Sequence, residues 1–234
     1  MDLKNKIILV TGGSAGIGLA AAKLLKSKGA QVIINARNKE KLEAVGKEFG
    51  LETIQGDVAS EDDVKKIYRV ISDKFGKLDV LVNNAGYGYF SLLEEIDTEN
   101  FNRVFATNVT GAMMMAREAV KFFKAQNSGN IINISSTAGT KGFAGGTAYS
   151  ATKFALKAMT ECWRAELRKY NVRVILINPS EVQTDFVINS GREARDYNPT
   201  KLQSEDIAHT ICAALEMEDR GFITELTVFA TNPQ

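Results

Sequence analysis

Short apolar runs alternate with longer helical patterns along the chain, and this order constrains the fold more than any single motif. The short runs, predicted as strands, are residues 7–10, 32–35, 53–55, 80–82, 131–134, 172–177 and 224–229. Those at Ile7, Val80, Ile131 and Val172 are apolar at consecutive positions, as in strands that helices cover on both faces of a parallel sheet. The chain is therefore predicted to form an α/β fold with a doubly wound parallel sheet.

The composition agrees with one folded domain. With 234 residues, of which 44% are hydrophobic and 24% charged, the chain can bury a sizeable core. No internal repeat, low-complexity stretch or linker divides it, so a single domain over residues 1–234 is predicted. Ser60 and Ser204 are predicted helix N-caps, because each precedes acidic residues that suit a first helical turn.

Charge and cysteine content narrow the classes of function. A formal net charge of +1 without a basic block argues against a nucleic-acid partner. No stretch reaches the roughly 20 apolar residues that cross a bilayer, and the first residues lack a signal-peptide pattern, so a cytoplasmic protein without a membrane partner is expected. Cys162 and Cys212 lie in helical apolar patterns typical of reduced core thiols. The single His209 excludes a multi-histidine site, so no metal is expected.

A glycine-rich turn follows the first predicted strand. Gly12, Gly16 and Gly18 lead into a helix predicted over residues 17–27. Positions without side chains let the backbone approach a pyrophosphate, and the helix N-terminus attracts its negative charge. The turn is a candidate dinucleotide site, with a purely structural turn as the alternative. Its spacing, Gly-x-x-x-Gly-x-Gly, differs from the commoner Gly-x-Gly-x-x-Gly.

The end of the second predicted strand bears on the choice of cofactor. An acidic side chain there would bind the ribose 2′-hydroxyl of NAD, whereas an arginine would accommodate the 2′-phosphate of NADP. The strand ends Asn35-Ala36-Arg37, without a carboxylate. Arg37, helped by a hydrogen bond from Ser14, is the predicted phosphate partner, so NADP(H) is preferred and NAD(H) stays open. A solvated surface arginine is the alternative.

Three residues are candidates for acid/base chemistry. Tyr149 and Lys153 are one helical turn apart and share a face if a helix begins near Tyr149. An ammonium group favours the phenolate and so brings a tyrosine nearer to useful acidity. Ser136 follows a predicted strand at the carboxyl edge of the sheet, where its hydroxyl could bond a substrate oxygen. Taken singly, the tyrosine and the lysine also suit packing and solvated surface positions.

These motifs resemble the short-chain dehydrogenase/reductase family over essentially the whole chain, in order as well as identity. The matching segments are Thr11-Gly-x-x-x-Gly-x-Gly18, Asp57-Val58, Asn83-Asn84-Ala85-Gly86, Asn108, Ser136, Tyr149-x-x-x-Lys153 and Pro179 to Thr184. The resemblance implies a Rossmann-like fold and hydride transfer between a nicotinamide cofactor and a carbonyl or alcohol.

The resemblance also implies a role for each matching residue. Tyr149 would be the general acid/base, Lys153 would hold the nicotinamide ribose and tune the tyrosine, and Ser136 would orient the carbonyl. Asn108 would support a water-linked proton relay to the lysine. The implied cofactor contacts are Gly12, Ser14, Gly16, Ile17, Gly18, Arg37, Asp57, Val58, Asn83, Asn84, Ala85, Gly86, Tyr149, Lys153, Pro179, Val182 and Thr184.

The chain departs from the family pattern at three places. Ala15 replaces the usual arginine of the glycine turn, so the NADP preference rests mainly on Arg37. Ser180 replaces a glycine in the segment Pro-Gly-x-Val-x-Thr, and would be strained if that position required a positive φ. The C-terminal residues look more like the 3-hydroxy acid dehydrogenase branch than like 3-oxoacyl-[acyl-carrier-protein] reductases.

Three predicted loops at the catalytic edge would form the substrate walls. They carry Tyr87, Tyr89 and Phe90, then residues 140–146, then residues 186–198, the last being the expected mobile lid. The aromatic residues favour an apolar pocket. The basic residues Lys141, Arg192 and Arg195 would suit a carboxylate or a phosphopantetheine arm, or simply solvent.

The apolar run Met113-Met114-Met115-Ala116 follows Asn108, where the family builds a subunit interface. A homodimer or homotetramer is expected, with a buried core helix as the alternative. The predicted function is NADP(H)-preferring interconversion of a ketone or aldehyde and an alcohol, with a small-molecule or carrier-protein-bound substrate. The rival hypothesis is a catalytically idle NAD(P)-binding regulator of the same fold.

Overall fold

The computed structural model describes residues 1–191, 193 and 196–232. Within these residues, seven parallel strands form one sheet in the order β3-β2-β1-β4-β5-β6-β7. The strands are β1 (Ile7–Thr11), β2 (Gln31–Ala36), β3 (Glu52–Gln55), β4 (Val80–Asn83), β5 (Gly129–Ile134), β6 (Val172–Pro179) and β7 (Glu225–Val228). All the predicted strands are confirmed, with ends that move by two residues at most. The α/β, doubly wound fold predicted from their continuous apolar runs is therefore confirmed.

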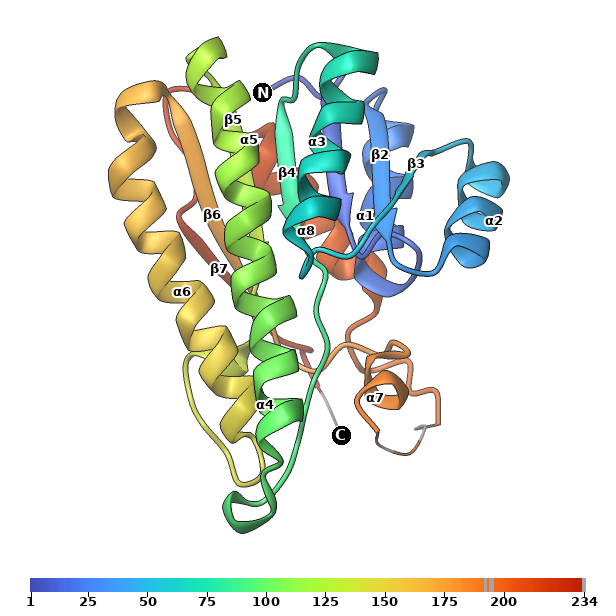
Figure 1. Cartoon of the computed structure of the whole chain (residues 1–234), viewed down its shortest axis with the longest axis vertical. Coiled ribbons are helices and arrows are strands. Elements are labelled where there is room, and N and C mark those ends of the chain that lie inside the picture. Colours follow the sequence, from blue (N-terminus) through green and yellow to red (C-terminus); the bar gives the residue numbers. More distant parts are fainter. Residues whose placement is uncertain (192, 194–195, 233–234) are drawn as a thin grey trace.

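Helices cover both faces of the sheet, as Figure 1 shows. The helices are α1 (Gly16–Ser27), α2 (Lys39–Phe49), α3 (Glu61–Phe75), α4 (Thr98–Phe105), α5 (Ala112–Gln126), α6 (Thr147–Leu167), α7 (Phe186–Asn189) and α8 (Ser204–Glu216). One core cluster joins α1 and α8 to strand side chains such as Val10 and Val82. The other joins α3 and α5 to side chains that point the opposite way, such as Leu9 and Leu81. No helix of the described residues is long and apolar enough to cross a membrane.

The strand order creates a crevice at the carboxyl edge of the sheet. Strand β1 pairs with β2 on one side and with β4 on the other, so the connections after β1 and β4 leave in opposite directions. Ligands of open α/β sheets bind at such a switch point.

Helices α4 and α5 form one continuous run that a π-helical segment, η2 (Ala106–Gly111), interrupts. Extra residues of this kind within a helix are frequent at functional sites. Asn108 lies in this segment and is buried. The π-turn therefore places Asn108 in the protein interior, at a point where the helix departs from regular α-helical geometry.

Several local predictions can now be judged. Ser60 caps α3, because its side chain accepts a hydrogen bond from the Asp63 backbone N–H. Ser204 does not cap α8: Gln203 is the N-cap, and its backbone N–H donates to Asp206 at 2.8 Å. Cys212 is buried as predicted, whereas the prediction for Cys162 was wrong, since it lies on the exposed side of α6.

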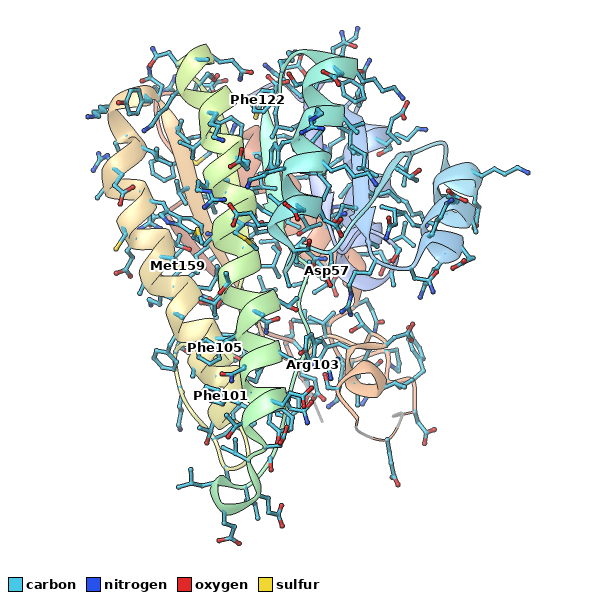
Figure 2. All side chains as sticks on the ribbon, in the orientation of Figure 1. Asp57, Phe101, Arg103, Phe105, Phe122 and Met159 are labelled. Carbon is cyan, nitrogen blue, oxygen red and sulfur yellow. The ribbon has the colours of Figure 1, made fainter. Side chains whose placement is uncertain are left out.

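The methionine run contributes more to the core than to the surface. Met114 and Met115 are buried against the sheet, and only Met113 is half-buried. On the same continuous helix, Phe101 and Phe105 stack with ring centroids 4.8 Å apart on the part of α4 labelled in Figure 2. The expected homo-oligomer stays a prediction.

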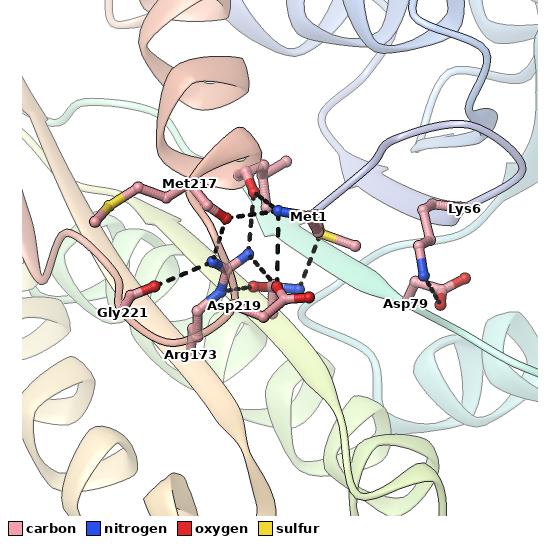
Figure 3. Close-up of polar contacts among 9 residues, drawn as sticks. Met1, Lys6, Asp79, Arg173, Met217, Asp219 and Gly221 are labelled. Atoms are coloured by element: carbon pink, nitrogen blue, oxygen red, sulfur yellow. Dashed lines mark hydrogen bonds and ion pairs between the residues drawn. The ribbon is translucent and has the colours of Figure 1, made fainter.

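Arg173 lies near the start of β6, at the amino-terminal edge of the sheet, opposite the crevice at the carboxyl edge (Figure 3). Its buried guanidinium donates to Asn130 Oδ1 at 2.6 Å, to the Leu215 carbonyl at 3.0 Å and to the Met217 carbonyl at 3.1 Å. Burial lowers the pKa of this arginine, and Asp219, 3.7 Å away, opposes that effect. Arg173 thus shares the carbonyls at the C-terminal end of α8 with the terminal ammonium of Met1, which donates to Leu215 at 2.9 Å and to Met217 at 2.6 Å.

We expect Arg173→Met to lower the free energy of unfolding by about 3 kcal/mol, because the buried Asn130 Oδ1 loses its donor and the Leu215 and Met217 carbonyls keep only the terminal ammonium of Met1, while the apolar stem is retained. Urea unfolding followed by circular dichroism measures the change. Arg69→Met, at an exposed position of α3, is the matched control and should change stability by less than about 0.5 kcal/mol. Equal effects of the two substitutions would contradict this account of Arg173.

Candidate functional site

A cavity of about 1440 Å³ occupies the crevice at the carboxyl edge. Most of the predicted site residues line it, although they come from distant parts of the sequence. These are Gly12, Ser14, Gly16, Ile17, Arg37, Asp57, Val58, Asn84, Ala85, Gly86, Ser136, Tyr149, Lys153, Pro179, Val182 and Thr184. The fold therefore brings the glycine turn and the proposed acid/base residues into one elongated site.

The glycine turn has the shape of a cradle for a pyrophosphate. A Cβ atom at Gly18 would lie 2.4 Å from the Gly12 carbonyl oxygen, and one at Gly12, where φ is +65°, would lie 2.9 Å from Ala85 Cα. Helix α1 begins directly beyond this turn, and its N-cap, Ala15, makes no side-chain capping bond. The uncapped N-terminus of a 12-residue helix at the cavity fits a negatively charged ligand.

Thr11 ties the glycine turn to the turn after β4. Its hydroxyl accepts hydrogen bonds from the backbone N–H groups of Asn84 and Ala85, each at 3.0 Å, and donates to the Val82 carbonyl. In return, the Asn84 side chain donates to the Thr11 and Gly12 carbonyls. These bonds hold the two sides of the cradle at a defined separation.

Three predicted site residues stand behind the cavity wall rather than in it. Gly18 allows the close packing described above. The Asn83 side chain is buried and donates to Asn133 Oδ1 and to the Ala112 carbonyl, so it braces β4 against α5 and β5. Asn108 is the third. The structure places these residues as supports for the groups that face the cavity.

Arg37 lies where a ribose phosphate is expected, after the end of β2. Its side chain is 64% exposed and lies 3.9 Å from the Asp57 carboxylate, a surface ion pair of small energetic value. Lys41, one turn further along, also lines the cavity. Lys41 was not predicted as a site residue, because surface lysines are common in amphipathic helices and the sequence does not show which of them faces the ligand.

Lys153 and Tyr149 project from the first two turns of α6 into the same part of the cavity. The Lys153 ammonium lies 5.5 Å from the centroid of the Tyr149 ring and donates to the Ile134 carbonyl at 2.9 Å. Burial lowers the pKa of Lys153 from 10.5 to about 8. At neutral pH the ammonium form still predominates, so a positive charge stands beside the tyrosine.

Ser136 follows β5 and caps the short helical turn η3 (Thr137–Gly139). Its Oγ accepts a hydrogen bond from the Ala138 backbone N–H at 3.1 Å. Since a hydroxyl can donate as well as accept, this bond orients Ser136 and leaves its proton for a ligand in the cavity.

The Asn108 side chain has a definite set of partners. Its Oδ1 accepts from the Tyr87 backbone N–H at 3.1 Å, and its Nδ2 donates to the Tyr87 carbonyl at 2.9 Å and to Thr152 Oγ1 at 3.2 Å. The Thr152 hydroxyl in turn donates to the Tyr149 carbonyl at 2.7 Å. Asn108 therefore links the turn after β4 to the helix that carries Tyr149. Thr152 was missed because its hydroxyl acquires this meaning only when α6 packs on the π-turn.

The substrate side of the cavity follows the sequence prediction only in part. Tyr87, Phe90, Phe143, Phe186 and residues 141–142 line it. Tyr89 was predicted wrongly, because its hydroxyl accepts a hydrogen bond from the Asp97 backbone at the start of α4. Arg192 and Arg195 lie outside the described residues.

Two further observations concern the cavity wall. Ser180 has no positive φ, and its backbone N–H donates to the Val228 carbonyl at 2.8 Å, so the strain considered for this position does not arise. Arg103 lines the cavity from the side of α4 that faces α7 (Figure 2), and Thr107 lines it from the π-turn. No sequence signal marked either residue, because the π-turn alters the helical phase.

The fold and its cavity define an α/β protein of the dinucleotide-binding class. The chain belongs to the short-chain dehydrogenase/reductase family of oxidoreductases, since the family model described as short chain dehydrogenase matches residues 6–195. It is 33% identical over 232 residues to an uncharacterized oxidoreductase of Staphylococcus aureus (strain USA300), with 97% of each chain covered.

Two solved structures illustrate the similarity. An alcohol dehydrogenase from the archaeon Thermococcus sibiricus, complexed with 5-hydroxy-NADP, is 26% identical with a TM-score of 0.88 and coverage of 99% of this chain and 100% of that one. The 3-ketoacyl-(acyl-carrier-protein) reductase from Brucella melitensis, complexed with NADH, is 28% identical with a TM-score of 0.89 and 98% coverage of both chains. The family membership predicted from the motifs is confirmed.

Proposed function

We propose that this protein is an NADP(H)-preferring oxidoreductase that interconverts a ketone or aldehyde and the corresponding alcohol. The observation that carries the proposal is the convergence of Ser136, Tyr149 and the buried ammonium of Lys153 in one cavity with the glycine cradle. The alcohol dehydrogenase and reductase titles of the two solved relatives support the same reaction type. Their cofactors, an NADP derivative and NADH, support a nicotinamide site.

The proposed mechanism assigns the proton steps to this chain's own residues. In the reduction direction, Ser136 donates a hydrogen bond to the carbonyl oxygen and stabilises its developing charge. Tyr149 transfers its phenolic proton to that oxygen, and the Lys153 ammonium stabilises the phenolate that remains. A bound nicotinamide dinucleotide would supply the hydride, and its pyrophosphate would be held at the turn of Gly12 to Gly18. Asn108, through its bonds to Thr152 and Tyr87, holds α6, the helix that carries Tyr149, in position against the turn after β4.

A carbonyl panel tests the proposal. In the reduction assay, the purified protein should oxidise NADPH in the presence of at least one member of a set that includes 3-oxoacyl thioesters, simple ketones and aldehydes. In the reverse assay, with NADP+, it should oxidise 3-hydroxy acids or simple alcohols. The 3-oxoacyl thioesters and the 3-hydroxy acids are the substrate classes that the family branches suggest. Tight NADPH binding without any turnover would instead favour the idle nucleotide-binding regulator. The presence of a complete acid/base set argues against that alternative, because nucleotide sensing needs no proton donor.

We expect Arg37→Ala to raise the NADPH dissociation constant about tenfold, which is about 1.4 kcal/mol, and to leave the NADH constant within about twofold. A guanidinium interacts with the 2′-phosphate, which NADH lacks. Fluorescence titration measures both constants. Lys39→Ala removes an equally exposed positive charge that does not line the cavity and is the matched control. Unchanged discrimination in Arg37→Ala would remove this residue from the argument for NADP.

We expect Thr152→Val to lower kcat about fivefold, because the Asn108 amide loses its acceptor and the Tyr149 helix loses a brace. Thr160 provides a matched control, since it accepts from Asn133 at 2.8 Å and donates to Leu156 in the same way, two turns further along α6. Both valine variants should lose about 1 kcal/mol of stability, but Thr160→Val should keep its kcat, and Thr152→Ser should restore it. Equal kcat values in the two valine variants would make the Thr152 bond purely structural.

A further inference from the structure

The aromatic side chains around Tyr149 form a continuous wall at one end of the cavity. The Phe90 ring lies 5.3 Å from the Tyr149 ring, tilted by 51°, and the Phe186 ring lies 5.5 Å away, tilted by 56°. Phe143 extends the wall, with its ring 6.1 Å from that of Phe90. All four rings line the cavity, and Phe143 is 50% exposed. We call Phe90, Phe143 and Phe186 the aromatic wall.

The backbone around the aromatic wall leaves room for these rings. A Cβ atom at Gly88 would lie 2.3 Å from the Phe90 ring, and one at Gly146 would lie 2.7 Å from the Phe143 ring. Larger residues at either glycine would force a ring to move. The positions of Phe90 and Phe143 are therefore built into the two loops that carry them.

Ser190 joins the third segment of the wall to the first. Its hydroxyl accepts from the Gly88 backbone N–H at 3.0 Å and donates to the Phe186 carbonyl at 2.6 Å. These two bonds connect α7 to the loop after β4 across 102 residues of sequence. Phe186 is thus held on one side of Tyr149 while Phe90 stands on another.

The charged residues of the cavity are distributed unevenly. Arg37, Lys41 and Asp57 line the adenosine end, near the tip of β2. Elsewhere, apart from Lys153, the described charged side chains that line the cavity are the exposed Arg103, Lys141, Glu181 and Asp185, two of each sign, and Glu181 pairs with Lys201 at 2.7 Å. The four rings form three pairs with interplanar angles of 33° to 56°, and they suit a further ring at an edge-to-face or offset angle, because aromatic pairs prefer such arrangements.

We propose that the aromatic wall selects a carbonyl compound with an uncharged aryl substituent next to the reacting carbon, in preference to a small alkyl ketone or a 3-oxo carboxylate. This inference rests on the proposed function, because it names the substrate class of the same site. The carbonyl oxygen would reach Ser136 and Tyr149, and the aryl group would pack among Phe90, Phe143 and Phe186. Burial of that ring supplies the selectivity.

Three probes of different chemistry test the proposal: acetophenone, 2-butanone and 3-oxobutanoate, each with NADPH. We expect kcat/KM for acetophenone to exceed that for 2-butanone at least about tenfold. Phe90→Leu and Phe186→Leu, which keep apolar bulk and remove the ring, should each lower this ratio about threefold or more. Phe229→Leu is the matched control, since Phe229 is exposed and does not line the cavity, and its ratio should stay that of the wild type. A preference for 3-oxobutanoate, or ratios that neither ring substitution changes, would overturn the proposal.

Calorimetry separates this inference from the proposed function. If the wild type turns over none of the probes, binding of acetophenone and 2-butanone to the protein saturated with NADP+ still reports on the wall. Tighter binding of acetophenone that Phe90→Leu or Phe186→Leu weakens would support aryl selection even though the carbonyl-reductase proposal had failed. Equal binding of the two ketones to the wild type would overturn aryl selection. Thermal unfolding of the variants shows whether the fold is retained.

Discussion

Tyr149→Phe should lower kcat about 1,000-fold and leave the NADPH dissociation constant within about twofold of the wild-type value. Phenylalanine keeps the ring that packs against Phe90 and Phe186 but has no hydroxyl, so a carbonyl oxygen that becomes an alkoxide receives no proton from it. Ser136 remains and still polarises the carbonyl, which is why some turnover should persist. Steady-state kinetics with the most active carbonyl of the panel, together with fluorescence titration of NADPH, measures the two effects.

Tyr68→Phe is the matched control for this substitution. The Tyr68 hydroxyl is buried under α5 and donates to the Met115 carbonyl at 2.6 Å, far from the cavity lining. Its loss should cost about 1 kcal/mol of stability without a large change in kcat. If Tyr149→Phe turned over like the wild type, Tyr149 could not be the proton donor and the proposed mechanism would have to be abandoned.

Lys153→Met should both abolish most turnover and make the protein without cofactor more stable at neutral pH. Burial lowers the pKa of Lys153 from its ordinary 10.5 to about 8, a difference that corresponds to about 3 kcal/mol. Methionine removes this penalty but also removes the bond to the Ile134 carbonyl, which offsets about 1 kcal/mol. The expected net gain is therefore about 2 kcal/mol at pH 7.

The gain should depend on pH in a defined direction. Between pH 8 and pH 10.5 the unfolded chain binds more protons at Lys153 than the folded protein does, so the stability of the wild type rises with pH in that window. Below pH 8 both states are mostly protonated and the penalty is complete. The advantage of Lys153→Met should thus shrink from about 2 kcal/mol at pH 7 to about zero at pH 9.5.

Urea unfolding at these two pH values measures the effect, and Lys157→Met, at a half-exposed position of α6, is the control for replacing another lysine of the same helix by methionine. A Lys153→Met protein that is less stable than the wild type at pH 7 would contradict the account. A confirmed gain would mean that this ammonium is kept at a cost to stability, as is common for groups that serve chemistry.

Much of the fold was predictable because its signals are local. Continuous apolar runs such as 131–134 and 172–177 reflect burial on both faces of a sheet, and that burial is the same wherever the strand sits in the order. The glycine turn was predictable for a similar reason, since Gly18 is required by the close approach of the Gly12 carbonyl within one strand-turn-helix unit, and Gly12 has a positive φ. Tyr149 and Lys153 share a helical face through their spacing alone.

The errors and omissions have a common cause, which is dependence on distant neighbours. Cys162 follows an apolar pattern, but helix packing left its side of α6 exposed. Tyr89 lies near other aromatic residues in the sequence, but its hydroxyl accepts a hydrogen bond from the Asp97 backbone N–H at the start of α4. In the sequence, Arg173 is simply a polar residue within a strand. Its role is visible only in the fold, where it donates to carbonyls at the end of α8.

The sequence by itself determined the order of the elements, the family and the candidate groups for acid/base chemistry, because each depends on residue type and short spacing. Only the tertiary structure decided that Asn108 bonds Thr152 and Tyr87, that Gly18 and Asn83 support the cavity from behind, and that the aromatic wall packs against Tyr149. These arrangements join segments that lie tens of residues apart, from the turn after β4 to the π-turn and α7. Their geometry is set by how the helices pack on the sheet, and no local pattern of residues carries that information.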